Sequence, residues 1–321
     1  MGGKVSRTDF EWVYTEEPHA TRRKTILKKH PEIKQLFGPD PLLKWVVTAM
    51  VLVQLMSLPL VARLSWPAAL LMAYCFGGVI NHSLMLAIHE ISHNLAFGHN
   101  HVMTNQLFGI FTNLTIGIPF FMSFKHYHKD HHMYLAEDGY DPDLPTLLEA
   151  KLFATSRGKF FWVCLQPFFY AFRPLVVRPK TPTQMEVINA IVQVFFDLVV
   201  WKLFGAKVLV YLIFGSLITL SVHPMSGHLI AEHYMFKKGF ETYSYYGPCN
   251  WLTFNAGYHV EHHDFPAVSW RKLPEVRRIA KEYYDNLPQH SSYVSVLWDF
   301  VTDPAIGPYA RVKRRHNGLD S

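Results

Sequence analysis

The sequence predicts an all-α membrane protein in which four transmembrane helices form two hairpins and a cytosolic helical cap holds a histidine-rich site for two metals. Half of the 321 residues are hydrophobic and 15% are aromatic, which is more apolar than a typical soluble domain. Four apolar stretches approach the roughly 20 residues that a bilayer core of about 30 Å requires. The chain also has 19 histidines, many of them in short clusters.

Charge and cysteine content narrow the possible partners. Lys and Arg outnumber Asp and Glu by 31 to 25, which suits an anionic lipid surface or an acidic protein partner. The basic residues are scattered between apolar segments and no nucleic-acid module is legible, so we expect no nucleic-acid partner. Cys75, Cys164 and Cys249 lie far apart without a C-x-x-C pair, which predicts neither a disulfide framework nor a thiolate metal site.

Residues 1–41 predict a cytosolic N-terminal arm, and residues 42–321 an integral-membrane domain. The arm is polar, charged and interrupted by prolines, and it lacks the apolar core of a signal peptide. Targeting to the membrane therefore falls to internal segments. Gly2, followed by Ser6, matches M-G-x-x-x-[ST], which makes Gly2 a candidate for N-myristoylation.

The links between the apolar stretches predict the topology. The expected spans cover residues 45–62, 66–88, 187–204 and 208–222. The first two are joined by "RLSW" and the last two by "GAK", and such short links make each pair a hairpin. Two hairpins place both termini and every histidine cluster on one side, which the distribution of Lys and Arg assigns to the cytosol. Asp197, inside the third span, has no assigned role.

Two further apolar runs, 107–124 and 160–177, contain Gly, Pro, Asn, Lys or Arg. We expect interfacial or re-entrant helices there, because a full crossing of either run would separate the histidine clusters. The aromatic runs "FFYAF" and "TYSYYG" are equally compatible with the wall of an acyl-chain tunnel and with a membrane-interface belt.

Three histidine clusters carry the chemistry. They are "HEISH" with His89 and His93, "HYHKDHH" with His128, His131 and His132, and "HVEHH" with His259, His262 and His263. Residues three and four apart share a helix face, so each cluster should direct its imidazoles to one point. The pattern H-x-x-H-H should occur only about 0.07 times in a shuffled chain of this composition, yet it occurs twice. The clusters follow the second and fourth spans, so they can meet at one membrane face.

Eight imidazoles exceed the four ligands of one tetrahedral zinc, so two metals are expected. Imidazole suits Fe, Zn, Cu and Ni, and the ligand type does not name the metal. "HEISH" also matches the H-E-x-x-H helix of zinc metalloproteases, in which Glu90 would be the general base. That interpretation leaves six clustered histidines unexplained. Two irons beside a membrane would suit the activation of O2 against an unactivated lipid C–H bond.

The order of the clusters between two hairpins resembles the membrane fatty-acyl desaturase and hydroxylase superfamily. Within it, the segments "SRTDFEWVYTEEPHATRR", "GPDP", "SGHLIAEHYMF", "ETYSYYGP" and "GYHVEHHDFP" resemble the sphingolipid delta-4 desaturases, also called dihydroceramide desaturases. The similarity runs from the arm to about Tyr309.

This resemblance implies a multi-pass enzyme of the endoplasmic reticulum that uses two non-haem irons and O2. Such an enzyme converts dihydroceramide to ceramide by forming a trans C4–C5 double bond, with NADH electrons delivered by cytochrome b5 reductase and cytochrome b5. This chain has neither a His-Pro-Gly-Gly haem signature nor a G-x-G-x-x-G fingerprint, so the donor would be a separate protein. Some relatives also hydroxylate C4 and make phytoceramide, which is the alternative outcome.

Relatives usually have a ninth histidine ligand, which maps onto His233 in "GHLIAEH", with His228 as the rival. The acids that could hold imidazole tautomers by accepting N–H bonds are Glu90, Asp130, Glu232 and Glu261, and Asn255 could bond a ligand or a bound water. We expect ordinary core or surface roles for the remaining histidines, namely His19, His30, His82, His99, His101, His126, His223, His290 and His316.

Overall fold

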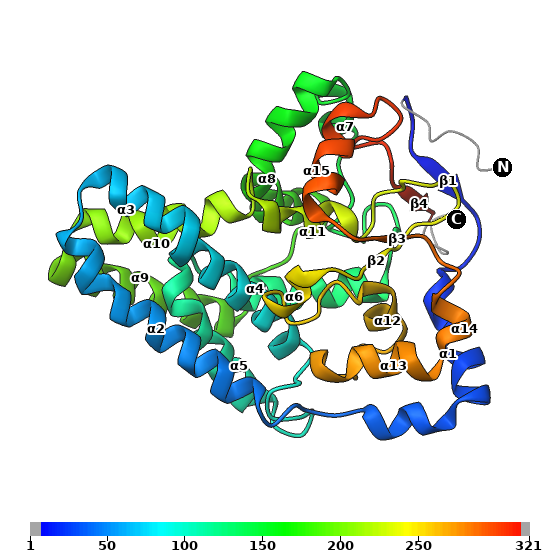
Figure 1. Ribbon diagram of the computed structural model, residues 1–321, viewed down its shortest axis with the longest axis horizontal. Coiled ribbons are helices and arrows are strands. Elements are labelled where there is room, and N and C mark those ends of the chain that lie inside the picture. The colour runs from blue at the N-terminus through cyan, green and yellow to red at the C-terminus, as the bar shows by residue number, and fades with distance from the viewer. Residues whose placement is uncertain (1–7, 316–321) are drawn as a thin grey trace.

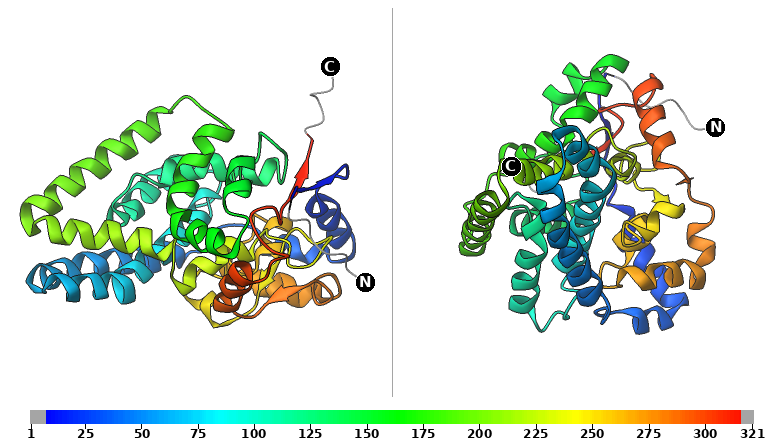
Figure 2. Two further views of the ribbon diagram at one scale, coloured as in Figure 1. Left: turned by 90° about the horizontal axis from the view of Figure 1, so that it is seen from above. Right: turned by 60° about the vertical axis from the view of Figure 1, so that its left-hand side comes forward.

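The computed structural model describes residues 8–315, and most of its regular structure is helical (Figure 1). The two hairpins are built by α2 (Leu43–Arg63), α3 (Trp66–Met72), α4 (Gly78–Ser92), α9 (Gln184–Phe204) and α10 (Ala206–Thr219). The remaining helices are α1 (Pro18–Lys29), α5 (Val102–Asn113), α6 (Phe121–Met133), α7 (Leu147–Leu152), α8 (Ser156–Val177), α11 (Gly227–Ala231), α12 (His259–Asp264), α13 (Leu273–Ile279), α14 (Lys281–Tyr284) and α15 (Tyr293–Thr302). Figures 1 and 2 show both hairpins extending in one direction. They point away from the part of the molecule that contains α1, α6, α7 and α11 to α15, which we call the cap.

The predicted spans correspond to helices, with one change. Four helices are long and apolar enough to cross a membrane: Leu43–Arg63, Trp66–Ser92, Ser156–Val177 and Gln184–Phe204. The expected fourth span, 208–222, is shorter than predicted because its helix ends at Thr219. The next helical segment, Pro224–Ala231, is bent by 46° relative to it. If each bent pair of helices is one span, the described residues hold up to 6 candidates, which fits a multi-pass membrane protein.

The first of the two apolar runs that we expected at the interface, 107–124, spans a sharp bend between two helices. Val102–Ile116 and Phe121–Met133 are bent by 115° relative to each other. The chain enters this pair just after His93 and carries His128 near its end, and the Nε2 atoms of the two histidines are only 2.9 Å apart. Since both ends of the pair meet at one point, a re-entrant arrangement accounts for the bend.

Helix α8 satisfies the length and composition of a span, but both of its ends contact the cap. Near its first turn, Lys159 Nζ donates to the carbonyl of Ile306 at 2.7 Å. Just past its last turn, Arg178 Nε donates to Asp130 of α6 at 2.7 Å. These contacts keep α8 on the side of the molecule that bears the histidines, as a peripheral helix would be.

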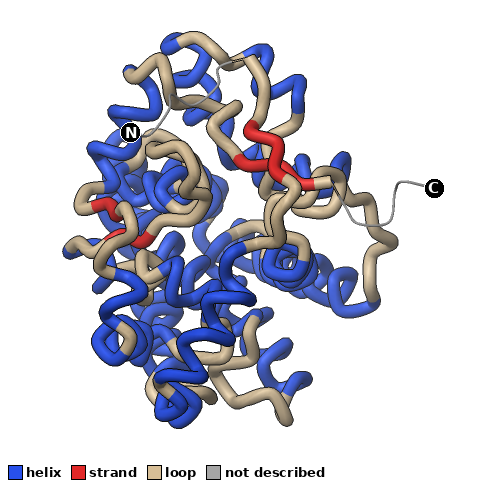
Figure 3. The backbone as a smooth tube through the Cα atoms, turned by 90° about the vertical axis from the view of Figure 1, so that its right-hand side faces the viewer, coloured by secondary structure: helices blue, strands red, loops and turns tan. Residues whose placement is uncertain are grey.

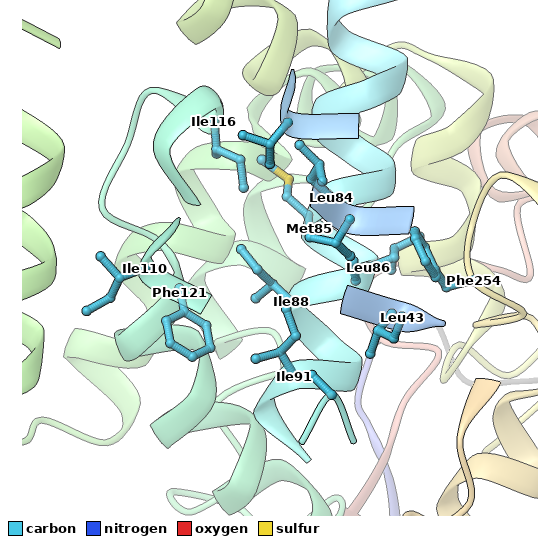
Figure 4. Packing of buried hydrophobic residues seen from close by; sticks show 14 of the residues in the cluster. Leu43, Leu84, Met85, Leu86, Ile88, Ile91, Ile110, Ile116, Phe121 and Phe254 are labelled. Atoms are coloured by element: carbon cyan, nitrogen blue, oxygen red, sulfur yellow. The ribbon is translucent and has the colours of Figure 1, made fainter. Parts of the chain in front are cut away.

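Helix α4 is the centre of the largest apolar core (Figure 4). Its residues Leu84, Ile88 and Ile91 are completely buried. The side chains packed around them include Leu43 of α2, Ile110 of α5, Phe121 of α6 and Phe254. Because α4 is enclosed by these neighbours, its last turn is held rigidly, and this turn carries His89.

Polar contacts join the hairpins, since lipid is as apolar as Leu and gives helices in a membrane no hydrophobic reason to associate. Gln54 Nε2 of α2 donates to Asn81 Oδ1 of α4 at 3.0 Å. Asn81 Nδ2 donates in turn to Ser216 Oγ of α10 at 2.9 Å. The chain of hydrogen bonds fixes α2, α4 and α10 relative to one another.

The N-terminal arm lies against the cap and the end of the described chain. Strand β1 (Glu11–Val13) pairs in parallel with β4 (Val312–Arg314), so residues 11 and 312 are neighbours. A second two-stranded pair joins β2 (Ser244–Tyr245) to β3 (Gln289–His290). Figure 3 shows these strands as the few non-helical elements of regular structure in the described chain. Ile26 of α1 is buried in one cluster with Val260 and Phe265 of the third histidine segment.

The close approach of α4 and α10 generates a stability prediction. A Cβ on Gly78 would lie 2.6 Å from the carbonyl oxygen of Gly215 and 2.8 Å from Thr219 Cγ2. Gly78→Val should therefore cost about 1–3 kcal/mol and lower the apparent Tm of the detergent-solubilised protein by several degrees. Val194→Leu, which adds bulk to a side chain that is 55% exposed, should leave Tm unchanged. Equal Tm values for both variants would contradict this packing.

Candidate metal centre

Nine histidines gather in two adjacent groups in which the ligand atoms all lie within 4.8 Å of one another. The first group contains His89, His93, His128, His132 and His262, and the second contains His131, His233, His259 and His263. The two groups touch, because the rings of His132 and His263 stack with centroids 4.3 Å apart. All eight clustered histidines and His233 are therefore brought together, whereas His228 lies outside both groups.

Each of the two H-x-x-H-H clusters divides between the groups. In α6, His128 and His132 belong to the five-histidine group and His131 to the four-histidine group. In α12, His259 and His263 belong to the four-histidine group and His262 to the other. The expectation that each cluster points to one place is therefore wrong. Consecutive residues differ by about 100° around a helix, so the third and fourth positions after a histidine point in different directions. In both helices the first histidine and the one four residues later share a group, and the one three residues later belongs to the other group.

The tautomers in the four-histidine group show what it is built to hold. His131 Nδ1 donates to Asp141 Oδ1 at 2.9 Å, and His233 Nδ1 faces the carbonyl of Glu241 at 3.3 Å. In the neutral tautomers that these contacts favour, both Nε2 atoms carry lone pairs, and these atoms are only 3.0 Å apart. Two facing lone pairs repel each other unless a cation lies between or beside them. The donor set therefore fits a metal ion.

Burial keeps the third cluster in the form that binds metals. Desolvation lowers the pKa of His259 to about 3 and lowers the pKa values of His262 and His263 well below the ordinary value. These imidazoles are therefore neutral at pH 7, which is the state required of a nitrogen ligand. Nitrogen ligands of this type suit iron and zinc equally, so the geometry alone does not choose the metal.

Two of the four expected carboxylates contact the histidine groups. Glu232 Oε1 accepts from His228 Nδ1 at 3.0 Å and lies 3.8 Å from His259 Nδ1. Glu90 Oε1 lies 3.6 Å from His89 Nδ1, and its other oxygen accepts from the backbone of Trp270. A role in orienting imidazoles remains a prediction for both acids.

The other expected polar contacts differ from the predictions. Asp130 pairs with Arg178 at 2.7 Å and with Lys180 at 2.5 Å. Glu261 accepts from Ser244 Oγ at 2.6 Å and from the Tyr246 hydroxyl. Asn255 has a positive φ of 51°, and its amide donates to the carbonyl of Trp270 at 2.9 Å. The partners found for these three side chains are not imidazoles, which spacing alone does not reveal.

Sequence reasoning missed the acid that holds His131 and the polar network behind His263. Asp141 follows its histidine by ten residues in an irregular loop, so helical spacing gave no signal for it. Asp264 directly follows His263 and accepts from His19 Nδ1 of α1 at 2.7 Å. The His19 ring lies 5.0 Å from the His263 ring, centroid to centroid. The arm thus completes the surroundings of the four-histidine group, although 245 positions separate His19 from Asp264.

The expected ordinary roles hold for most of the other histidines. His30 and His126 face Glu282 and Glu186, and the ring of His223 accepts from the backbone of Met225. His99 and His101 are exposed, and His290 packs against aromatic rings. His316 and Gly2 lie outside the described residues. His82 is the exception, because it is completely buried and neither ring nitrogen has a hydrogen-bond partner among residues 8–315.

A cavity of about 550 Å³ adjoins both histidine groups. Its walls include His89 and His128 of the first group and His131, His233 and His259 of the second. The rest of the wall is mainly apolar and includes Met85, Leu86, Phe124, Phe168, Leu217 and Leu220. The run "FFYAF" in α8 contributes Phe168, Tyr170, Ala171 and Phe172, whereas "TYSYYG" does not line the cavity. An apolar chain can therefore lie beside the imidazoles.

The sequence of this chain matches two protein families. Residues 63–295 match the family described as Fatty acid desaturase, and residues 6–42 match the family described as Sphingolipid Delta4-desaturase (DES). The chain belongs to the fatty acid desaturase family.

The similarity to individual relatives extends over the whole chain. The Sphingolipid delta(4)-desaturase DES1 of Drosophila melanogaster is 63% identical over 321 residues, covering 100% of both chains. The protein of that name from Rattus norvegicus is 58% identical over 318 residues, or 99% of this chain and 98% of its own. The Sphingolipid delta(4)-desaturase/C4-monooxygenase DES2 of Homo sapiens is 58% identical over 314 residues, or 98% of this chain and 97% of its own. These matches confirm the resemblance found in the sequence.

The contact between Asp141 and His131 can be tested directly. Asp141→Asn keeps the shape of the side chain but removes the charge that holds the Nδ1 proton of His131. Metal affinity should fall by about 10–100-fold, measured as bound metal per protein at limiting metal concentration. Asp130→Asn is the matched control, because Asp130 contacts Arg178 and Lys180 instead of an imidazole. Equal metal loss in both variants would contradict the role of Asp141.

Proposed function

We propose that this chain is an O2-dependent sphingolipid delta-4 desaturase that converts dihydroceramide to ceramide by forming a trans C4–C5 double bond. The observation that carries the proposal is the apolar cavity whose wall includes imidazoles of both histidine groups. The full-length similarity to relatives named sphingolipid delta(4)-desaturase supports the same substrate class.

The residues that would hold two irons are the two histidine groups, with five imidazoles for one ion and four for the other. When bound, such a pair of ions supplies the activation of O2 that an unactivated C–H bond requires. Asp141 and the Glu241 carbonyl hold the N–H of His131 and His233 away from the centre. Glu232 lies beside His259, where it can orient that ring.

The cavity walls supply position and exclude water. Leu86 and Leu220 come from α4 and the end of α10, and Phe168 comes from α8 across the space. Packing between these side chains would hold a saturated chain against the imidazoles and keep bulk water from the reacting carbons. Position matters because two neighbouring hydrogens must be removed in turn from the same chain.

The electron donor would be cytochrome b5, reduced by its NADH-dependent reductase, since this sequence carries no haem or dinucleotide signature of its own. The excess of Lys and Arg favours an acidic partner of this kind. We place the protein in the endoplasmic reticulum membrane with both termini and the histidine clusters in the cytosol. Myristoylation of Gly2 belongs to the same proposal.

C4-hydroxylation is the second candidate outcome, because relatives 58% identical to this chain are named desaturase/C4-monooxygenase. Both reactions would start from the same bound lipid and differ in the fate of the C4 position. The zinc metalloprotease interpretation of "HEISH" is not supported by the geometry. His89 and His93 lie in a group of five histidines, whereas a catalytic zinc site uses three protein ligands and keeps one position open.

Expression in desaturase-null cells tests the proposed reaction. Lipid mass spectrometry should show dihydroceramide converted to ceramide, with phytoceramide scored separately. His259→Ala should abolish conversion, because it removes an imidazole from the four-histidine group. His30→Ala, on the surface beside Glu282, should retain it. Unchanged dihydroceramide in cells that express the wild-type chain well would refute the proposal.

The variant Glu90→Gln distinguishes the desaturase hypothesis from the metalloprotease hypothesis. A metalloprotease that loses its general base typically loses about 10²–10⁴-fold in rate. Because Glu90 here accepts a hydrogen bond from the backbone of Trp270, Glu90→Gln should lower ceramide formation by no more than a few-fold. The measurement is the initial rate in membranes supplied with NADH and cytochrome b5. A loss of ceramide formation as complete as in His259→Ala would overturn this expectation.

A further inference from the structure

The imidazole of His82 is buried without a hydrogen bond of normal geometry to any described residue. It lies in α4, seven residues and therefore two turns before His89, on the same helix face and about 10 Å away along the axis. Neither ring nitrogen makes a hydrogen bond to a described residue, although the carbonyl of Thr219 is near. Even if one nitrogen turned to that carbonyl, the other would stay unpaired. Burial of an unpaired polar group costs about 1–3 kcal/mol, so His82 calls for an external partner.

His82 belongs to a row of polar side chains in the cavity wall, which we call the polar wall: His82, His228 and Glu232. The His82 ring meets the His228 ring edge to face, with centroids 4.9 Å apart. His228 Nδ1 donates to Glu232 at 3.0 Å, and Glu232 lies 3.8 Å from His259. The row therefore leads from the four-histidine group into the apolar part of the cavity, where its neighbours are Met85, Leu86, Leu217 and Leu220.

A plain hydrocarbon chain cannot form hydrogen bonds with these polar side chains, and apolar walls alone would hold it. A ligand with hydroxyl or amide groups a few bonds from the reacting carbon would pair these side chains. On the proposed function, the substrate is a sphingoid lipid whose C1 hydroxyl, C2 amide and C3 hydroxyl directly precede the C4–C5 bond. The polar wall and the lipid head group thus have matching chemistry and a matching place relative to the metal centre.

We propose that the polar wall is the head-group subsite of this enzyme. His82, the member farthest from the histidine groups, binds the C1 hydroxyl, and the His228–Glu232 pair lies beside the amide and the C3 hydroxyl. Anchoring the head at this distance places C4, rather than a carbon further along the chain, at the metal centre. The polar wall is thus a specificity determinant of the reaction described above, and the inference rests on that function.

The experiment compares binding of two lipids to the full chain in nanodiscs with cytochrome b5, its reductase and NADH. Ceramide and 1-deoxyceramide, which lacks the C1 hydroxyl, are assayed as competitive inhibitors of dihydroceramide conversion. The wild-type protein should bind ceramide about ten-fold more tightly, which is the effect of one hydrogen bond to a buried partner. His82→Leu should remove this difference by weakening ceramide alone. Met85→Leu, on the apolar wall, should preserve it.

Stability distinguishes a ligand-binding His82 from a structural one. Since His82 is unpaired in the protein, His82→Leu should retain bound iron and a Tm at least as high as the wild-type value. A large drop in Tm would show that His82 serves the fold, which would overturn the proposal. His228→Leu is the second variant, and it should weaken the binding of ceramide and 1-deoxyceramide equally, because His228 lies beside the amide and the C3 hydroxyl that both lipids carry.

The outcomes separate the subsite from the function. Failure of the wild-type chain to convert dihydroceramide would refute the proposed function itself. Conversion with an unchanged ten-fold preference in His82→Leu would refute only the subsite. If instead Tyr170→Phe on the α8 wall abolishes the preference, the head group lies at the opposite wall of the cavity and the proposal is wrong.

Discussion

The facing lone pairs of imidazoles are the constraint on which the rest of the fold depends. His131 and His233 present unprotonated nitrogens to each other at 3.0 Å because Asp141 and a backbone carbonyl hold their protons on the opposite side. Such an arrangement is unfavourable without a cation, and it persists only if the surrounding structure holds every ring in place. The buried core around α4, the hydrogen bonds between hairpins and the docked arm all serve this purpose.

The histidines come from segments that a simple transmembrane bundle would keep apart. The α5–α6 pair, bent by 115°, returns the chain to the end of α4, so that His128 meets His93. Helix α8 remains in contact with the cap at both ends and closes the cavity opposite α4. The bend after Thr219 turns the chain into α11, which brings His228, Glu232 and His233 to the same place. Departures from regular spanning helices therefore create the site.

Periodicity and cluster spacing predicted the hairpins and the eight clustered histidines, because both signals are local. They did not predict how α6 and α12 divide their histidines, since that depends on the position of each helix between two centres. Asp141 was missed because it lies in an irregular loop, and His19 because its partner Asp264 is 245 positions away. The sequence also predicts an ordinary role for His82, which has no clustered histidine near it. Only packing could reveal that its nitrogens are unpaired.

The pairing of β1 with β4 has a consequence for biosynthesis. Residues 11–13 leave the ribosome early, yet their partner strand, residues 312–314, is among the last of the described chain to be made. Arg314 of that strand also pairs with Glu241, whose carbonyl faces His233. The arm and the surroundings of the four-histidine group can therefore close only after residues 312–314 have been made.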